Sequence, residues 1–248
     1  MRTVSGPVHA YLAGEGTDGR GRAARAVLAK TTINDVVERI TGTPFADHVA
    51  RSVLAPAGMT SSTFAQPLPD ELRPRLSQGY ATASQPPGPF ETVGPAPAGS
   101  LTASVTDLAR FALAHLGEPA GGSPLLSPAT LELMREPALD ATTLGALAAG
   151  PRMTLGLFDE SRNGHRILGH GGDTQLFHSH LQLYPDDRTA VVVALNSAGR
   201  GPADTLELRQ ALLTGFADRY FPQGTGPTMA LRACMFTNTL DEHFILDH

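Results

Sequence analysis

Hydrophobic positions near the start of the chain recur with a helical period. Four of them are spaced by three and four residues and therefore share one stripe: Ile33, Val36, Val37 and Ile40. Gly42 follows the stripe, and glycine is typical just beyond a helix end. The pattern predicts a core helix over residues 32–40. A second helix is expected over residues 45–53, begun by Thr43 and Pro44 and ended by the breaker at 56–58.

The middle of the chain changes character. Residues 61–101 hold eight of the 20 prolines, which predicts a long irregular segment with the tripeptide at 78–80 as its one anchored point. Ser104 and Asp107 resemble a capping box that opens a helix reaching His115. Ser127 and Pro128 indicate the start of another, shorter helix.

Beyond residue 153 the hydrophobic period falls to two, which is typical of strands. Strands are expected over residues 153–158, 165–168 and 177–183. Residues 189–195 are uniformly apolar and therefore predict a central strand buried on both faces. A closing helix carries Leu208, Leu212 and Phe216. Helices followed by an antiparallel meander indicate an α+β fold, with flanking helices around the sheet.

Composition excludes several classes of protein. The net charge of −5 is dispersed, so neither nucleic acid nor a membrane surface is expected as a partner. No stretch approaches the roughly 20 apolar residues that span a bilayer, and the first residues lack the apolar core of a signal peptide. The sequence as written therefore predicts a cytoplasmic protein. The single cysteine, Cys234, excludes an internal disulfide.

Several phrases, in order, resemble the serine beta-lactamase and penicillin-binding-protein-like hydrolases. Residues 38–45 and 54–59 are similar to that family's helix, corner and "PLGM" signature, and residues 97–101 with 106–111 are similar to its "PAGGL…DLARF" stretch. Residues 164–185 are similar to the strand and hairpin that flank the active site. The resemblance runs from about Thr31 to Phe221. It implies the C-terminal portion of a class C beta-lactamase-related domain, incomplete at its N-terminus.

Acyl transfer in this family needs a nucleophilic serine and a lysine base, which sit as Ser-x-x-Lys on one helix face. Lys30 is the only lysine, and Val27 stands three residues before it, so the motif is absent from these 248 residues. The second motif, Tyr-x-Asn, is also absent from the region near Arg25 where the family's spacing would put it. The resemblance therefore implies a partial hydrolase, inactive as written, and it implies no cofactor.

The third motif of the family is present. Gly169-His170-Gly171-Gly172 resembles the Lys-Thr-Gly box, with His170 in the place of the lysine. The resemblance implies that the glycines let substrate approach the strand and that the amide of Asp173 is one of two oxyanion donors. An imidazole attracts a substrate carboxylate less than a lysine does, which favours ester or amide substrates over beta-lactams. The alternative is that His170 has no functional role and is a polar residue beside a glycine-rich turn.

Other candidate groups have structural interpretations. Residues 161–163 form a literal Ser-x-Asn, but Ser, Asn and the following glycine are typical of a hairpin turn. His178 and His180 share a strand face and could bind a metal with His165 or Asp159, although solvent-facing histidines are the simpler interpretation. Two further serines are weaker candidates for a nucleophile that acts with His170: Ser100 and Ser179. Strand alternation places Ser179 on the expected core face, with Phe177 and Leu181.

The sequence thus divides into an irregular segment over residues 1–30, a partial beta-lactamase-related domain over 31–221 and an irregular tail over 222–248. Two functional hypotheses remain open. The chain is either part of a serine hydrolase of ester, amide or peptide bonds, or a non-catalytic relative that binds a peptide or a protein partner. A small-molecule or peptide ligand is expected in both cases. A missing core element would expose apolar surface, so self-association is also expected.

Overall fold

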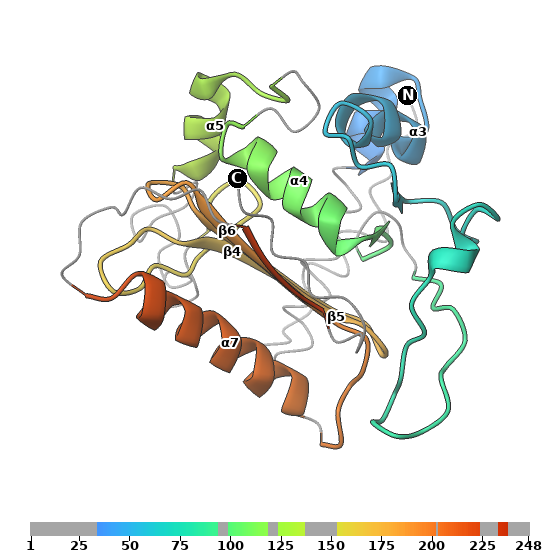
Figure 1. Cartoon of the computed structure of the whole chain (residues 1–248). Coiled ribbons are helices and arrows are strands. Elements are labelled where there is room, and N and C mark those ends of the chain that lie inside the picture. Colours follow the sequence, from blue (N-terminus) through green and yellow to red (C-terminus); the bar gives the residue numbers. More distant parts are fainter. Residues whose placement is uncertain are drawn as a thin grey trace, which may run out of the picture.

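The computed structural model describes residues 34–93, 99–118, 124–136, 153–201 and 203–223, and the backbone of 233–237. A five-stranded sheet lies between two helices, α4 (Val105–His115) on one face and α7 (Asp204–Tyr220) on the other (Figure 1). The expected α+β class, with a sheet and flanking helices, is confirmed.

The sheet has the order β3-β4-β5-β6-β7. Its strands are β3 (Phe158–Asp159), β4 (Leu168–Asp173), β5 (His178–Tyr184), β6 (Thr189–Leu195) and β7 (Ala233–Thr237). The first four pair antiparallel, with His170 opposite Leu181 and Gly172 opposite Ser179. β6 lies between β5 and β7 and is largely buried on both sides, as the sequence predicts.

One feature of the C-terminal part was not expected from the sequence. β7 adds a parallel strand to β6, beside the antiparallel strands of the sheet. A parallel edge strand takes its place through distant backbone pairing, which no local period reveals. A strand was also expected over residues 153–158, but β3 begins only at Phe158. Among residues 153–157 only Met153 pairs, with Phe158, because Gly156 adopts a φ of +100° that turns the chain.

Successive side chains of the strands point to opposite faces of the sheet and form parts of two separate hydrophobic cores. The α7 face of the sheet, which we define by Ile167, Tyr184, Val191 and Val193, packs on Leu213 and Phe216 of α7. The opposite α4 face carries Leu181, Leu183 and Ala190, which pack on Ala112 and Leu116. His170 and Gly172 also belong to the α4 face, because directly paired residues point to the same side.

The N-terminal lobe contains a helix over residues 34–41, then α3 (Phe45–Val49), which continues into a π-helical turn, η1 (Ala50–Leu54). Gly42 ends the first helix with a φ of +64°, as predicted. The core role predicted for this helix is wrong within the described residues: Val36 is 47% and Ile40 79% exposed. The cap predicted at Thr43 is replaced by Glu38, whose carboxylate accepts the amide hydrogen bond of Phe45 at 2.7 Å.

Short elements connect the lobe to the sheet. β1 (Ser62–Thr63) pairs with β2 (Thr102–Ala103), and a 3-10 turn, η2 (Arg73–Arg75), lies in the irregular segment between them. α5 (Pro128–Arg135) begins at Ser127, as predicted. No helix in the described ranges has both the length and the apolar character needed to cross a bilayer.

Candidate functional site

The His-Gly-Gly box lies inside β4, at the end of the strand that leads to Asp173. A strand was expected over residues 165–168. The observed strand β4 begins at Leu168 and continues through the box. β3 pairs only with Leu168 and Gly169. Among the described residues, β5 alone flanks Gly171, Gly172 and Asp173. Within the described part of the chain, the stretch from Gly171 to Asp173 therefore has a strand on one side and none on the other, and we call this other side the open side of β4.

Close neighbours explain the glycines of this strand. A Cβ atom on Gly169 would lie 2.5 Å from Cδ of Glu160, and one on Gly171 would lie 2.9 Å from Nδ1 of His180. Both contacts are on the α7 face, where a side chain would displace these groups. On the other face, a Cβ on Gly172 would make an ordinary contact, 3.6 Å from Oγ of Ser179. The α4 side of the box is therefore the less crowded one.

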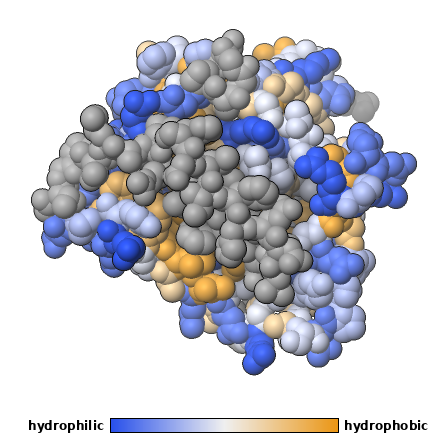
Figure 2. Space-filling model, viewed as in Figure 1, coloured by the Kyte–Doolittle hydropathy of each residue, from blue (hydrophilic) through white to orange (hydrophobic). Residues whose placement is uncertain are grey.

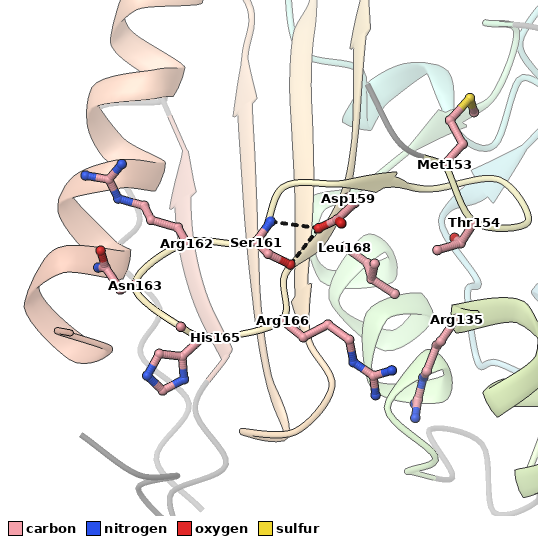
Figure 3. Close-up of a pocket in the computed structure, with 11 residues that line it drawn as sticks. Arg135, Met153, Thr154, Asp159, Ser161, Arg162, Asn163, His165, Arg166 and Leu168 are labelled. Carbon is pink, nitrogen blue, oxygen red and sulfur yellow. Dashed lines mark hydrogen bonds between the residues drawn. The ribbon is translucent and has the colours of Figure 1, made fainter. Parts of the chain in front are cut away.

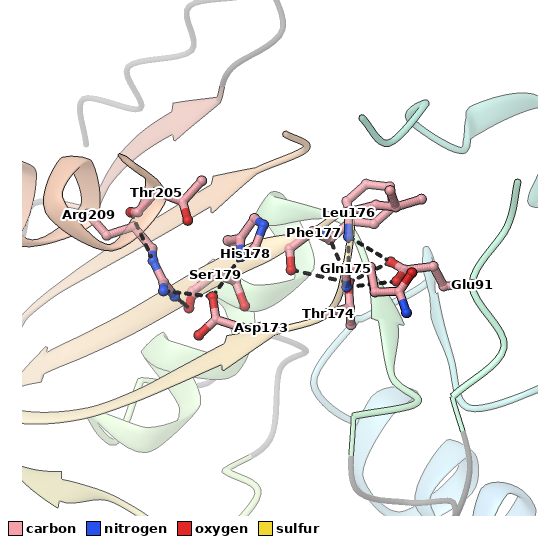
Figure 4. Close-up of polar contacts among 10 residues, drawn as sticks. All are labelled: Glu91, Asp173, Thr174, Gln175, Leu176, Phe177, His178, Ser179, Thr205 and Arg209. Atoms are coloured by element: carbon pink, nitrogen blue, oxygen red, sulfur yellow. Dashed lines mark hydrogen bonds and ion pairs between the residues drawn. The ribbon is translucent and has the colours of Figure 1, made fainter. Parts of the chain in front are cut away.

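Asp173 ends β4 in a fixed position (Figure 4). Its Oδ1 is 2.7 Å from Nδ1 of His178 and 2.7 Å from a terminal nitrogen of Arg209 on α7. Arg209 is 4% exposed and also donates to the carbonyl of Ser179. Partial burial alone would raise the pKa of Asp173, but the hydrogen bonds from His178 and Arg209 outweigh it and lower that pKa below its ordinary value. We call Asp173, His178 and Arg209 the strand clamp.

The turn after the clamp is held by a residue that the sequence analysis missed. Glu91 accepts hydrogen bonds from Thr174 Oγ1 at 2.5 Å, from the amide of Gln175 at 2.8 Å and from the amide of Leu176 at 3.2 Å (Figure 4). Glu91 lies in the proline-rich irregular segment, 83 residues before Thr174. No local pattern marks such a contact, so sequence reasoning had no signal for it.

The tripeptide at 78–80 is anchored, as the sequence predicts. The amide of Tyr80 donates to the carbonyl of Asn196 at 2.8 Å, and its carbonyl accepts from the amide of Ala198 at 2.9 Å. The long segment is therefore fastened to the end of β6, beside the turn that Glu91 holds. The two attachments bring the irregular segment to the same end of the sheet as Asp173.

The histidines are paired in a way that the sequence analysis did not expect. His178 is 8% exposed rather than solvent-facing, and a carboxylate orients each ring: Asp173 for His178 and Glu160 for His180. His165 pairs instead with the buried Asp187, at 2.8 Å. In the ranges that the structure describes, no three His, Cys, Asp or Glu side chains form a group able to hold a metal ion.

The serine candidates occupy different places. Ser161 precedes a tight turn in which Asn163 and Gly164 both have positive φ, which confirms the hairpin prediction. Ser100 is buried in the connection before β2. Ser179 shares the α4 face with His170, two pairs further along the ladder, so its expected face is confirmed. The structure thus brings Ser179, and not Ser161, near the box.

Comparisons with known proteins point to one family. Residues 28–216 match the family model described as Beta-lactamase. A human protein named beta-lactamase-like 1 (Homo sapiens) is 29% identical over 161 residues, which cover 65% of this chain and 31% of that protein. The chain spans about a third of the length of this relative.

Solved structures are similar in fold. The octameric penicillin-binding protein homologue from Pyrococcus abyssi aligns with a TM-score of 0.54 and 21% identity, over 75% of this chain and 41% of that one. A class C beta-lactamase from Rhodobacter sphaeroides aligns with a TM-score of 0.44 and 15% identity, over 63% and 50% of the two chains. The likeness to the Pyrococcus protein shows that the two chains share a fold, with their sheet and helices in the same arrangement.

Proposed function

Because the chain belongs to the beta-lactamase family, we propose that it supplies the substrate-binding strand of a serine hydrolase domain and performs no acyl transfer by itself. The observation that carries this proposal is the end of the His-Gly-Gly box: among the described residues, Gly171 to Asp173 have a strand on one side only, and the strand clamp holds them. An extended substrate segment would lie along the open side as an added strand, with main-chain hydrogen bonds to β4.

The box favours a particular class of substrate. A lysine is charged at neutral pH and would attract a carboxylate, whereas a histidine attracts it less. His170 stacks on Phe158 with ring centroids 5.6 Å apart, which gives this end of the strand an aromatic surface. Esters, amides or peptides are therefore the proposed substrates of the complete domain, in preference to beta-lactams.

The amide of Asp173 would supply one oxyanion donor, and the strand clamp would hold that amide in place. The second donor, the nucleophile and its base would have to come from elsewhere, since these 248 residues contain no Ser-x-x-Lys. Ser179 lies on the same face of the sheet as His170, but among the described residues its hydroxyl forms no hydrogen bond with a base. Acyl-enzyme chemistry by this chain alone is therefore not expected.

Intact mass after incubation with a fluorophosphonate, which tags activated serines, tests the proposal. We expect no adduct on the chain, and none on the matched Ser179→Ala variant. A stoichiometric adduct that disappears in Ser179→Ala would contradict the proposal and assign a nucleophile outside Ser-x-x-Lys. An adduct that persists in Ser179→Ala and disappears in Ser100→Ala would contradict it equally.

The second candidate function is non-covalent binding of a peptide or protein segment, which the open side of β4 favours. Amide hydrogen exchange distinguishes it from the first. A peptide that adds to the strand would slow exchange at Gly171 to Asp173 without forming an adduct. Faster or unchanged exchange at these amides in the presence of saturating peptide would count against strand addition.

A further inference from the structure

A cavity lies at the start of β4, beside Leu168 and apart from the His-Gly-Gly box. It has a volume of about 450 Å³ and lies between the C-terminal end of α5 and the hairpin over residues 159–166 (Figure 3). Met153 and Leu168 form apolar parts of its wall. Three arginines are among the polar residues that line it: Arg135, Arg162 and Arg166. A cavity of this size is within the range of small-molecule sites.

Two of the three arginines converge on one side of the cavity. In Figure 3 the side chains of Arg135, from α5, and Arg166, from the hairpin, extend toward the same region, whereas Arg162 extends away from it. Arg162 forms a two-pronged ion pair with Asp218 of α7, at 2.8 and 2.9 Å. Its charge is therefore already neutralised on the other side of the hairpin.

Arg135 is held in place and only partly hydrated. Its side chain is 15% exposed, and one terminal nitrogen donates to the carbonyl of His115 at the end of α4. Desolvation by burial lowers the pKa of the Arg135 guanidinium; Glu132 opposes the shift, and the positive charge of Arg166 adds to it. The two cations are thus close enough to repel each other.

The negative partners of these two arginines are exposed and do not line the cavity. Glu132 is 3.9 Å from Arg135 and 3.8 Å from Arg166, and Asp186 is 2.9 Å from Arg166. Both carboxylates are more than half exposed, at 56% and 58%, so water weakens their attraction. Asp159 does line the cavity, but its Oδ1 accepts hydrogen bonds from the amide and hydroxyl of Ser161.

One donor of this pair has no acceptor among the described residues. Nε of Arg166 is buried and forms no hydrogen bond with any of them, although other atoms of the same side chain are paired. A buried donor without an acceptor destabilises the folded state, and an acceptor bound in the cavity would remove that cost. The guanidinium group also presents adjacent donors in a plane, which matches the oxygens of a phosphate or carboxylate.

We propose that this cavity binds a small oxyanion-bearing molecule, with its phosphate or carboxylate group between Arg135 and Arg166. The apolar wall at Met153 and Leu168 would then contact the rest of the molecule. The site is distinct from the His-Gly-Gly box, because Leu168 lines the cavity and none of residues 169–173 does.

Thermal unfolding with inorganic phosphate, acetate and chloride at constant ionic strength tests the proposal, because a ligand of the folded state raises the midpoint. We expect phosphate or acetate to raise the midpoint above that in chloride, and the stronger of the two identifies the preferred oxyanion. Arg166→Gln should weaken binding at least about tenfold, the effect of one lost charge-assisted hydrogen bond. Arg51→Gln, which removes an exposed arginine of the N-terminal lobe, is the matched control and should leave binding within about twofold.

A measurement on the unaltered chain keeps the test independent of variant stability. In amide NMR spectra, phosphate should shift signals of residues 161–166 and leave those of Gly171 to Asp173 in place. Equal midpoints in all three salts would overturn the proposal. So would wild-type affinity in Arg166→Gln, or shifts confined to other regions.

Discussion

At the scale of single residues, buried charges hold segments together that are distant in the sequence. Asp107 is fully buried and accepts hydrogen bonds from the amide of Ser61, the hydroxyl of Ser62 and the guanidinium of Arg110. Ser104 caps α4 as predicted, yet Asp107 binds the N-terminal lobe rather than completing a capping box. Sequence spacing located the pair, but the distant partners decided what the carboxylate does.

Asp218 gives a pH-dependent contribution to stability. Hydrogen bonds from Arg162 and Asn163 lower the pKa of Asp218 from 3.8 to about 2. Between these values the unfolded chain binds more protons, so the contribution is present above about pH 4 and is lost as pH falls toward 2. We expect Asp218→Asn to be less stable than wild type at pH 7, with the difference shrinking toward pH 2.

Urea unfolding midpoints of the two proteins from pH 7 to pH 2 measure this difference. Asp70→Asn serves as the control, because the side chain of Asp70 is 91% exposed. A gap between wild type and Asp218→Asn that stays constant over the whole range would refute the assignment.

At the scale of elements, the glycines differ in the space around them: some have close neighbours, and others have none. Gly169 faces the Glu160 carboxylate, which in turn contacts His180 and Gln182. Gly215 lies in the middle of α7 with nothing within 4 Å of an added Cβ. We expect Gly169→Ala to destabilise the fold by about 2 kcal/mol through overpacking. Gly215→Ala should stabilise it by up to about 1 kcal/mol, because alanine is the better helix former.

Chemical denaturation of both variants measures these changes in the free energy of unfolding. A loss of stability in Gly169→Ala together with a gain in Gly215→Ala would support the stated packing, because the two substitutions add the same methyl group. A Gly169→Ala variant as stable as wild type would show that Glu160 moves aside without cost.

The boundaries of elements were predictable where the pattern was strong. The apolar run at 189–195 coincides with β6, and the expected helix through Leu208, Leu212 and Phe216 is α7. The pattern failed in β4, because Gly169 to Gly172 carry no hydrophobic side chains and only backbone pairing with β5 makes them a strand. It also failed for His178, whose burial depends on Asp173 and on the packing beside α7.

At the scale of the whole molecule, apolar surface remains on the outside. Figure 2 shows hydrophobic residues gathered in the region where α7 lies in Figure 1, and Leu206 and Leu208 of that helix are 54% and 46% exposed. Val36 and Ile40 form a further apolar pair on the helix over residues 34–41. Such surfaces favour association with another protein surface.

We therefore expect self-association. Light scattering should give a mass above that of the monomer, rising with concentration, and the double variant V36Q/I40Q should lower it. The matched control is Leu133→Gln, which removes an exposed leucine of α5 that is 58% exposed. A monomer at every concentration, unfolding in one cooperative step, would refute the expectation.

The sequence by itself determined the family, the α+β class and the place of the His-Gly-Gly box, because these depend on ordered motifs and on periods within short windows. Only the tertiary structure decided which partners complete that box. The strand clamp, the contacts of Glu91 and the pair of Arg135 and Arg166 in the cavity join residues from separate elements. Their energies depend on burial and distance, and neither is a property of a short stretch of sequence.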